Sequence, residues 1–237
     1  MIFNALHLLI DLHYLPSLEF FSVLQQFHSV ELEQQEHYVK QSYRNRCFIN
    51  TAQGVQMLVV PVTHKSGKTL LKDVRLEDTV RWKNNHWRTL ESAYRKAPYY
   101  EHYADDLKEL LYQPCSFLFD LNLKLLSFCL KSVRHKPDLS VTQTYQQTTA
   151  GACQDMRSAI QAKIPYTARK YYRPVPYYQI FGNQFVPNLS VVDLLFCAGP
   201  GQVPFWPPPS IKNEQIISAP RFKIADGCIS KKYWPLS

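Results

Sequence analysis

The stretch IFNALHLLIDLHYLPSLEFFSVLQQFHSVELEQQE, residues 2–36, decides the fold class of this chain. Residues 2–12 are mostly apolar without a helical polar face, which predicts a buried strand, and Pro16 stops that strand from continuing. Ser17 is suited to cap a helix that runs to about Phe27, and residues 29–36 look extended again. A strand, helix, strand order favours a right-handed crossover and a partly parallel sheet.

Ligands of such sheets bind at the carboxyl ends of the strands. In this chain those ends hold His13, Tyr14, Glu36, His37 and Tyr38. The beginning of the sequence therefore predicts both a fold class and an edge of the sheet where a site would lie.

The rest of the chain adds a hairpin and a helical middle section. Residues 44–50 and 55–62 are predicted strands, joined by a turn in which Gly54 supplies a positive φ angle. Lys72 to Leu76 alternates between apolar and polar residues and is expected to be another strand. Helices are expected over residues 79–96, 99–113 and 116–134. The fold class is α/β, with a mixed, partly parallel sheet and a helical middle section.

The C-terminal part has a weaker pattern. A short helix is expected near Ser158 and Ile160, and residues 177–182 are expected to form a strand. Asn188 or Ser190 would cap a helix over residues 191–197. Eleven of the sixteen prolines lie after residue 164. We expect a single domain over residues 1–200 and a Pro-rich, loosely ordered tail over residues 201–237.

Composition narrows the class of partner. The net charge of +8 favours anionic partners, and because no run of five or six cations occurs, nucleic acid is an unlikely partner and an anionic small-molecule substrate is expected. The six cysteines are never closer than fourteen positions, so no Cys-x-x-Cys pair exists. The apolar N-terminus lacks a cationic lead and is interrupted by Asp11. We expect a cytoplasmic protein without a membrane span.

Two segments concentrate chemically active side chains, residues 36–46 and the helix expected over residues 79–96. One face of that helix carries Val80, Trp87, Leu90, Tyr94 and Ala97, and another carries Arg81, Arg88 and Arg95. His37 and His86 are the expected proton-transfer groups, with Glu36 as a base or as the partner that orients an imidazole. The candidate substrate-binding residues carry aromatic, amide or guanidinium groups: Tyr14, Tyr38, Tyr43, Arg44, Asn45, Arg46, Trp82 and Arg88.

Each of these residues also has a structural interpretation. Arg44 and Arg46 can share one anion, but they can equally pair with Glu33 or Glu36 across a sheet. Arg88 can belong to an ordinary solvated helix face. Each histidine can be a hydrogen-bonded structural residue. The sequence leaves these alternatives open.

Several common motifs are absent. Ser66-Gly67-Lys68-Thr69 resembles the end of a phosphate-binding loop, but that motif requires a glycine where Val62 stands, so we interpret it as a plain loop between strands. No Gly-x-Ser-x-Gly, His-Glu-x-x-His or Gly-x-Gly-x-x-Gly motif occurs. We expect no metal site and no cofactor.

Taken together, the motifs resemble the WbqC-like family of bacterial proteins. The resemblance rests on residues 13–21 (HYLPSLEFF), 36–38 (EHY), 40–46 (KQSYRNR), 71–74 (LKDV), 82 with 86–88 (W, HWR), 93–99 (AYRKAPY), 176–181 (PYYQIF) and 185–190 (FVPNLS), in collinear order. It covers roughly residues 5–200, and the tail with Trp206 and three consecutive prolines departs from it.

The resemblance implies a role in surface polysaccharide (O-antigen) biosynthesis, where transfer of glycine, another aminoacyl group or an acyl group to a nucleotide- or lipid-linked sugar is expected. In such a transferase Arg44, Arg46 and Arg88 would bind the anionic substrate, and His37 or His86 would move the proton. Trp82 or Tyr38 would stack on a sugar or base. The alternative is a noncatalytic protein that binds an anionic sugar or assembles a biosynthetic complex.

Overall fold

β1 (His7–Asp11) is an inner strand of a four-stranded parallel sheet in the computed structural model. The strand order is β7 (Asp138–Val141), β2 (Ser29–Glu33), β1, β8 (Cys153–Asp155). The structure describes residues 7–63, 69–77, 79–147 and 153–200. The register sets Asp11 opposite Glu33, so two carboxylates stand at the same edge of the sheet. The predicted strand, helix, strand beginning and the parallel pairing are confirmed.

α1 (Leu18–Leu24) connects β1 to β2 and is buried along its whole length. Ser17 has an extended backbone, and its side chain accepts a hydrogen bond from the N–H of Phe20, which satisfies a donor of the first turn. Glu19 lies in that first turn, where the helix dipole favours a negative charge. Because Glu19 is fully buried, it also needs a cationic partner, and Arg169 supplies one.

The predicted hairpin is formed by β3 (Arg46–Thr51) and β4 (Gly54–Val59). Gly54 has a φ of 97°, which explains why glycine follows the turn. Cys47 and Ile49 on β3 face the core together with Leu58 on β4. The short strands β5 (Val62–Thr63) and β6 (Arg75–Leu76) form a second antiparallel pair.

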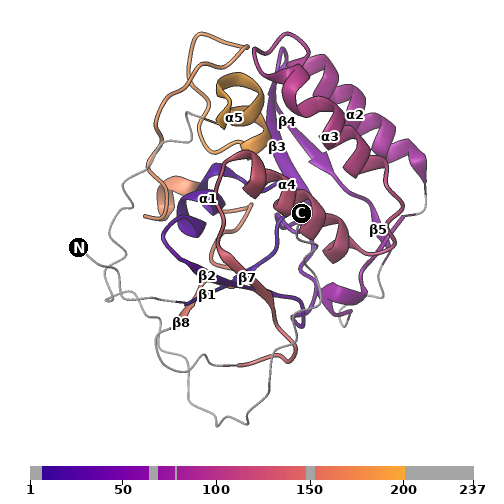
Figure 1. Ribbon diagram of the computed structural model, residues 1–237, viewed down its shortest axis with the longest axis vertical. Helices are drawn as coiled ribbons and strands as arrows, with labels where there is room; N and C mark the ends of the chain where they lie inside the picture. Colours follow the sequence, from indigo (N-terminus) through magenta and orange to yellow (C-terminus); the bar gives the residue numbers. More distant parts are fainter. Residues whose placement is uncertain (1–6, 64–68, 78, 148–152, 201–237) are drawn as a thin grey trace.

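The helical section consists of α2 (Val80–Tyr94), α3 (Tyr100–Tyr112) and α4 (Leu118–Ser132), and a later helix, α5 (Val191–Ala198), joins them. α3 packs against each of the other three, and α2 and α5 also contact β3 (Figure 1). Ser190 caps α5 by accepting a hydrogen bond from the N–H of Val192. Among the described residues, no helix combines the length and apolarity needed to cross a bilayer.

Some local predictions were wrong. Residues 71–73 form a 3-10 helix, so that the strand expected from Lys72 to Leu76 shrinks to β6. Residues 177–182 form no strand, because side-chain hydrogen bonds, and not a ladder, hold this segment. The helix expected near Ser158 is a turn in which that residue has a φ of 54°. The tail 201–237 and most of the loop 66–69 lie outside the described residues.

Candidate functional site

The topology gathers polar groups where the strand order reverses. β1 is followed by β2 on one side, and β8 pairs with its other side, so the carboxyl end of β1 is a switch point of the sheet. Asp11 is the last residue of β1, and His13 follows two positions later. After β8 the chain brings Ser158 to the same place, where its N–H donates to Asp11 Oδ1 at 2.7 Å. We call the group formed by Asp11, His13 and Ser158, together with Arg44 and Glu36, the sheet-edge site.

Asp11 accepts from two cationic or polar side chains in addition to that amide. Its Oδ2 lies 3.0 Å from His13 Nε2 and 3.2 Å from Arg44 Nη2. Burial alone would raise the pKa of Asp11, but Arg44, His13 and the Ser158 N–H outweigh burial and lower the pKa below its usual range. Asp11 is therefore an ionised carboxylate that accepts hydrogen bonds.

Arg44 spans the sheet-edge site. Its Nε and Nη2 donate to the two oxygens of Glu36 at 2.6 and 2.8 Å, and Nη2 also donates to Ser158 Oγ at 3.0 Å. Burial raises the pKa of Glu36, and the Asp11 carboxylate adds to this effect, whereas Arg44 opposes it. Arg44 is therefore the cation that neutralises the carboxylates of Asp11 and Glu36 inside the protein, and its own charge is balanced by them.

His13 has one ring nitrogen without a partner. Because the Asp11 carboxylate can only accept, Nε2 of His13 carries the hydrogen of their contact. Nδ1 is buried and has no hydrogen-bond partner among the described residues. The ring packs against Phe20, with centroids 4.8 Å apart, and stacks on Tyr43 at 5.3 Å. An unpaired buried acceptor costs about 1 to 3 kcal/mol, which a ligand hydroxyl or amine would recover.

Two further ion pairs frame this edge. Glu33 accepts from Thr142 Oγ1 at 2.7 Å and from Arg157 Nη1 at 3.1 Å, and Glu19 makes a two-point pair with Arg169 at 2.7 Å for each bond. The carboxylates along the edge are Asp11, Glu19, Glu33, Glu36 and Asp155, and the guanidiniums that pair with them are Arg44, Arg157 and Arg169. Five negative against three positive charges leave an excess of two negative charges, so the edge suits a neutral or amine-bearing group better than an anion.

His86 is buried on α2, and its two ring nitrogens bond to residues outside the sheet-edge site. Its Nε2 donates to the carbonyl of Val59 at 3.0 Å, so its Nδ1 accepts the Tyr14 hydroxyl at 2.9 Å. Burial lowers the pKa of His86 to about 4, although the bond to Val59 opposes this shift. Trp82 meets the ring edge-on at 5.2 Å. Tyr14, Trp82 and His86 are thus brought together, but as a packed group in which both imidazole nitrogens are occupied.

The candidate residues of segment 36–46 do not all lie at the sheet-edge site. Glu36, Arg44 and Tyr43 belong to the sheet-edge site or contact it. Asn45 donates from Nδ2 to the carbonyl of Val60 at 2.9 Å and so anchors the hairpin. The other members are Tyr38, which is half-buried, Arg46, which pairs with Val59 at the start of β3, and His37, which is exposed.

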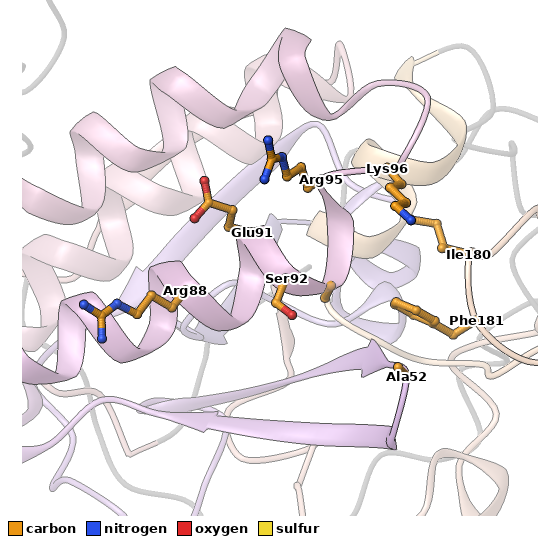
Figure 2. A pocket seen from close by; sticks show the side chains of 9 residues that line it. Ala52, Arg88, Glu91, Ser92, Arg95, Lys96, Ile180 and Phe181 are labelled. Atoms are coloured by element: carbon orange, nitrogen blue, oxygen red, sulfur yellow. The ribbon is translucent and has the colours of Figure 1, made fainter.

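Arg88 lies apart from all of these residues, on the exposed face of α2. It lines an open depression of about 450 Å³ that continues to Phe181, and we call this depression the α2 groove (Figure 2). The structure therefore brings some candidate residues together at the sheet-edge site and others in the core beneath α2, and it places Arg88 in the α2 groove. Four candidates belong to none of these three regions: His37, Tyr38, Asn45 and Arg46.

Sequence reasoning assigned no role to Asp11, His13, Ser158 or Arg157. A signal existed for Asp11, because a carboxylate that ends an otherwise apolar strand needs a buried partner. His13 stood at the predicted strand end without a role. Ser158 and Arg157 carried no signal, because they lie in a segment without periodicity and reach the site only through the pairing of β8.

Within the described parts of the chain, no group of three or more His, Cys, Asp or Glu side chains has a geometry that could hold a metal ion. The charged side chains of the sheet edge pair with one another instead.

The parallel sheet and the helices around it make this an α/β protein, and a charged cluster lies at the switch point of its sheet. Its family is shown by sequence: the model of the WbqC-like protein family matches residues 12–174, and the chain belongs to this family. The chain is 27% identical over 218 residues to the uncharacterized protein Rv1507c of Mycobacterium tuberculosis (strain ATCC 25618 / H37Rv), which covers 81% of this chain and 93% of that protein. No solved structure matches the present chain.

Proposed function

We propose that this protein is a cytoplasmic transferase of surface polysaccharide biosynthesis, which moves an aminoacyl or acyl group onto a sugar carried by a nucleotide or a lipid. One observation supports catalysis above the others: His13 is held by Asp11 through one ring nitrogen, and its other ring nitrogen has no partner among the described residues. The polysaccharide context comes from the resemblance to the WbqC-like family.

The transfer needs a group that takes a proton from the acceptor. In the proposed step, His13 Nδ1 accepts the proton of a sugar hydroxyl or amine while the oxygen or nitrogen of that group attacks the carbonyl carbon of the donor. A new bond forms to the carbonyl carbon, and the bond from that carbon to the leaving group of the donor breaks. His13 then returns the proton to the leaving group, so the step is neutral in protons and electrons. The Asp11 carboxylate stabilises the imidazolium that exists in between.

The surroundings of His13 fit an uncharged acceptor. Because the sheet edge has more carboxylates than guanidiniums, a neutral sugar ring or an amine is favoured next to His13. The ring is almost completely buried under Tyr43, so the acceptor reaches Nδ1 when this aromatic cover shifts. The tight Arg44 and Glu36 pair holds Asp11 in place during this movement.

The alternative is a noncatalytic protein that binds an anionic sugar or assembles a biosynthetic complex. One observation favours it: His86 is packed with both of its nitrogens bonded. A noncatalytic protein would tolerate the loss of every titrating imidazole as long as the fold survives.

The test uses cells that lack the gene and receive variants of it. His13→Gln and Asp11→Asn should abolish the glycan modification, since each removes the base or its correct tautomer, while His37→Gln serves as a matched control on an exposed ring. Surface glycan composition is measured by mass spectrometry, and thermal unfolding of each purified variant checks folding. Unchanged glycans with folded His13→Gln and Asp11→Asn would refute this mechanism, and loss with His37→Gln alone would move the proton transfer to that residue.

A further inference from the structure

The α2 groove has a cationic rim. Arg88 and Arg95 are seven positions apart on the same face of α2, about 10 Å along the helix axis, and Lys96 follows directly (Figure 2). All three are exposed. The ion pairs formed within the described parts of the chain involve other residues, so these three charges face solvent without a fixed partner. Glu91 is the single carboxylate in the lining.

Apolar side chains line much of the groove, and Ser92 on α2 adds a hydroxyl to it. Ala93 contributes from α2, Ala52 from the turn of the hairpin, and Ile180 with Phe181 from the segment before α5. Figure 2 shows Arg88 at one end of the lining and Phe181 at the other, and the Lys96 side chain is drawn toward Ile180. Apolar side chains next to several cations suit a molecule with one anionic end and one flat or apolar end.

The apolar wall is fixed to the core by buried hydrogen bonds. Asn50 Nδ2 donates to the carbonyl of Phe181 at 3.1 Å, and the backbone N–H of Asn50 donates to the Tyr94 hydroxyl at 3.2 Å. That hydroxyl donates to Asp193 at 2.7 Å, and the Tyr177 hydroxyl donates to the other oxygen of Asp193 at 2.6 Å. Because Asn50 and Asp193 are buried, this network holds the wall in place without a ligand. The groove is preformed.

We propose that the α2 groove binds a small molecule that joins a phosphate or diphosphate to a flat aromatic base or an apolar chain, such as a nucleoside diphosphate or a prenyl diphosphate. The guanidiniums of Arg88 and Arg95 would hold the phosphate oxygens, and Phe181 would cover the base or the prenyl chain. A volume of about 450 Å³ is in the range of sites for ligands of this size.

This inference stands apart from the proposed transfer chemistry. The Ala52 end of the groove lies at the turn of the β3 and β4 hairpin, and Arg44 lies just before the other end of the hairpin. Six residues of strand separate the two ends by roughly 20 Å. The side chains that contact His13 are those of Asp11, Phe20 and Tyr43, and none of these three lines the groove. Binding of a phosphate ligand is therefore measured without the transfer reaction.

Isothermal titration of the full chain at low salt tests the inference with three probes: uridine diphosphate, geranyl diphosphate and inorganic pyrophosphate. We expect one of the two organic diphosphates to bind more tightly than pyrophosphate, because only they can use the apolar floor, and the tighter one identifies whether the groove accepts a base or a prenyl chain. Arg88→Gln and Arg95→Gln should each weaken that binding about tenfold or more. Phe181→Ala should weaken the organic probe and leave pyrophosphate unchanged.

Arg81→Gln is the matched control, because Arg81 is an exposed arginine of the same helix that does not line the groove. It should change the affinity less than twofold. The inference is overturned if neither organic diphosphate binds, if pyrophosphate binds as tightly as both, or if Arg81→Gln weakens binding as much as Arg95→Gln. Since the substituted arginines are exposed, the arginine variants do not threaten the fold, and thermal unfolding checks Phe181→Ala, whose ring packs against the core. The result does not depend on the outcome for His13.

Discussion

Replacing His86 by Gln should change how the stability of this protein depends on pH. The imidazole bridges the Tyr14 hydroxyl and the carbonyl of Val59, with Nε2 as the donor and Nδ1 as the acceptor. A glutamine amide offers one donor and one acceptor as well, but it does not titrate. The variant therefore keeps the type of hydrogen bond and removes the proton equilibrium.

The size of the effect follows from the pKa of His86. Burial lowers this pKa from 6.5 to about 4 in the folded protein. The unfolded chain therefore binds more protons between these two values, so the contribution of this group to stability is present above pH 6.5 and is lost as the pH falls toward 4. Between about pH 7 and about pH 4.5, this single group should lower the free energy of unfolding by roughly 2 kcal/mol.

Urea unfolding at several pH values, followed by tryptophan fluorescence, measures this effect. Carboxylates also contribute to the pH dependence, but they are common to both proteins, so the difference between wild type and His86→Gln isolates the imidazole. His102→Gln is the control, because His102 is exposed on α3. If wild type and His86→Gln lose stability equally between pH 7 and pH 4.5, the ring is not held neutral by burial and the structural role assigned to His86 fails.

Three further substitutions test local contacts of the fold by urea unfolding at neutral pH. Arg169→Ala leaves the fully buried Glu19 without its cation and should cost about 3 to 5 kcal/mol, and a loss below about 1 kcal/mol would contradict the pairing. Ser17→Ala removes the cap of α1 and should cost about 1 kcal/mol. Gly199→Ala should cost about 1 to 2 kcal/mol, because φ is 70° and a Cβ would lie 2.7 Å from the ring of Tyr99, and shortening Tyr99 to Ala should restore part of that loss.

The fold was predictable where local signals agree with the tertiary structure. β1, α1 and β2 follow from an apolar run, a capping serine and a second extended run, which are all properties of neighbouring residues. Residues 177–182 show the limit of such signals. Their aromatic composition is typical of a strand, but the Tyr177 hydroxyl and the Gln179 amide bind Asp193 on α5, and this distant partner decides the conformation.

Helix periodicity was reliable for the interior of α2 and failed at its first turn. Trp87, Leu90 and Tyr94 are buried as predicted, whereas Val80 on the same predicted face is 61% exposed. Val80 is the first residue of the helix and projects beyond the surface against which the later turns pack. Periodicity gives the face of the helix on which a residue lies, but it does not show whether another element packs there. The same pattern did predict the exposed row of Arg81, Arg88 and Arg95.

The charged residues show why composition alone could not locate the site. A net charge of +8 indicates anionic partners, yet the arginines nearest to the strand ends have their charges balanced by carboxylates inside the protein. Arg44 pairs with Glu36 only eight positions away, which the sequence could suggest, whereas Arg157 reaches Glu33 across 124 positions. An arginine is available to a ligand only if no buried carboxylate needs it, and that depends on contacts that form through the tertiary fold. Arg88 and Arg95 have Glu91 between them in the α2 groove, but neither takes part in an ion pair of the described residues, and for this reason they are the cations to which we assign an anionic ligand.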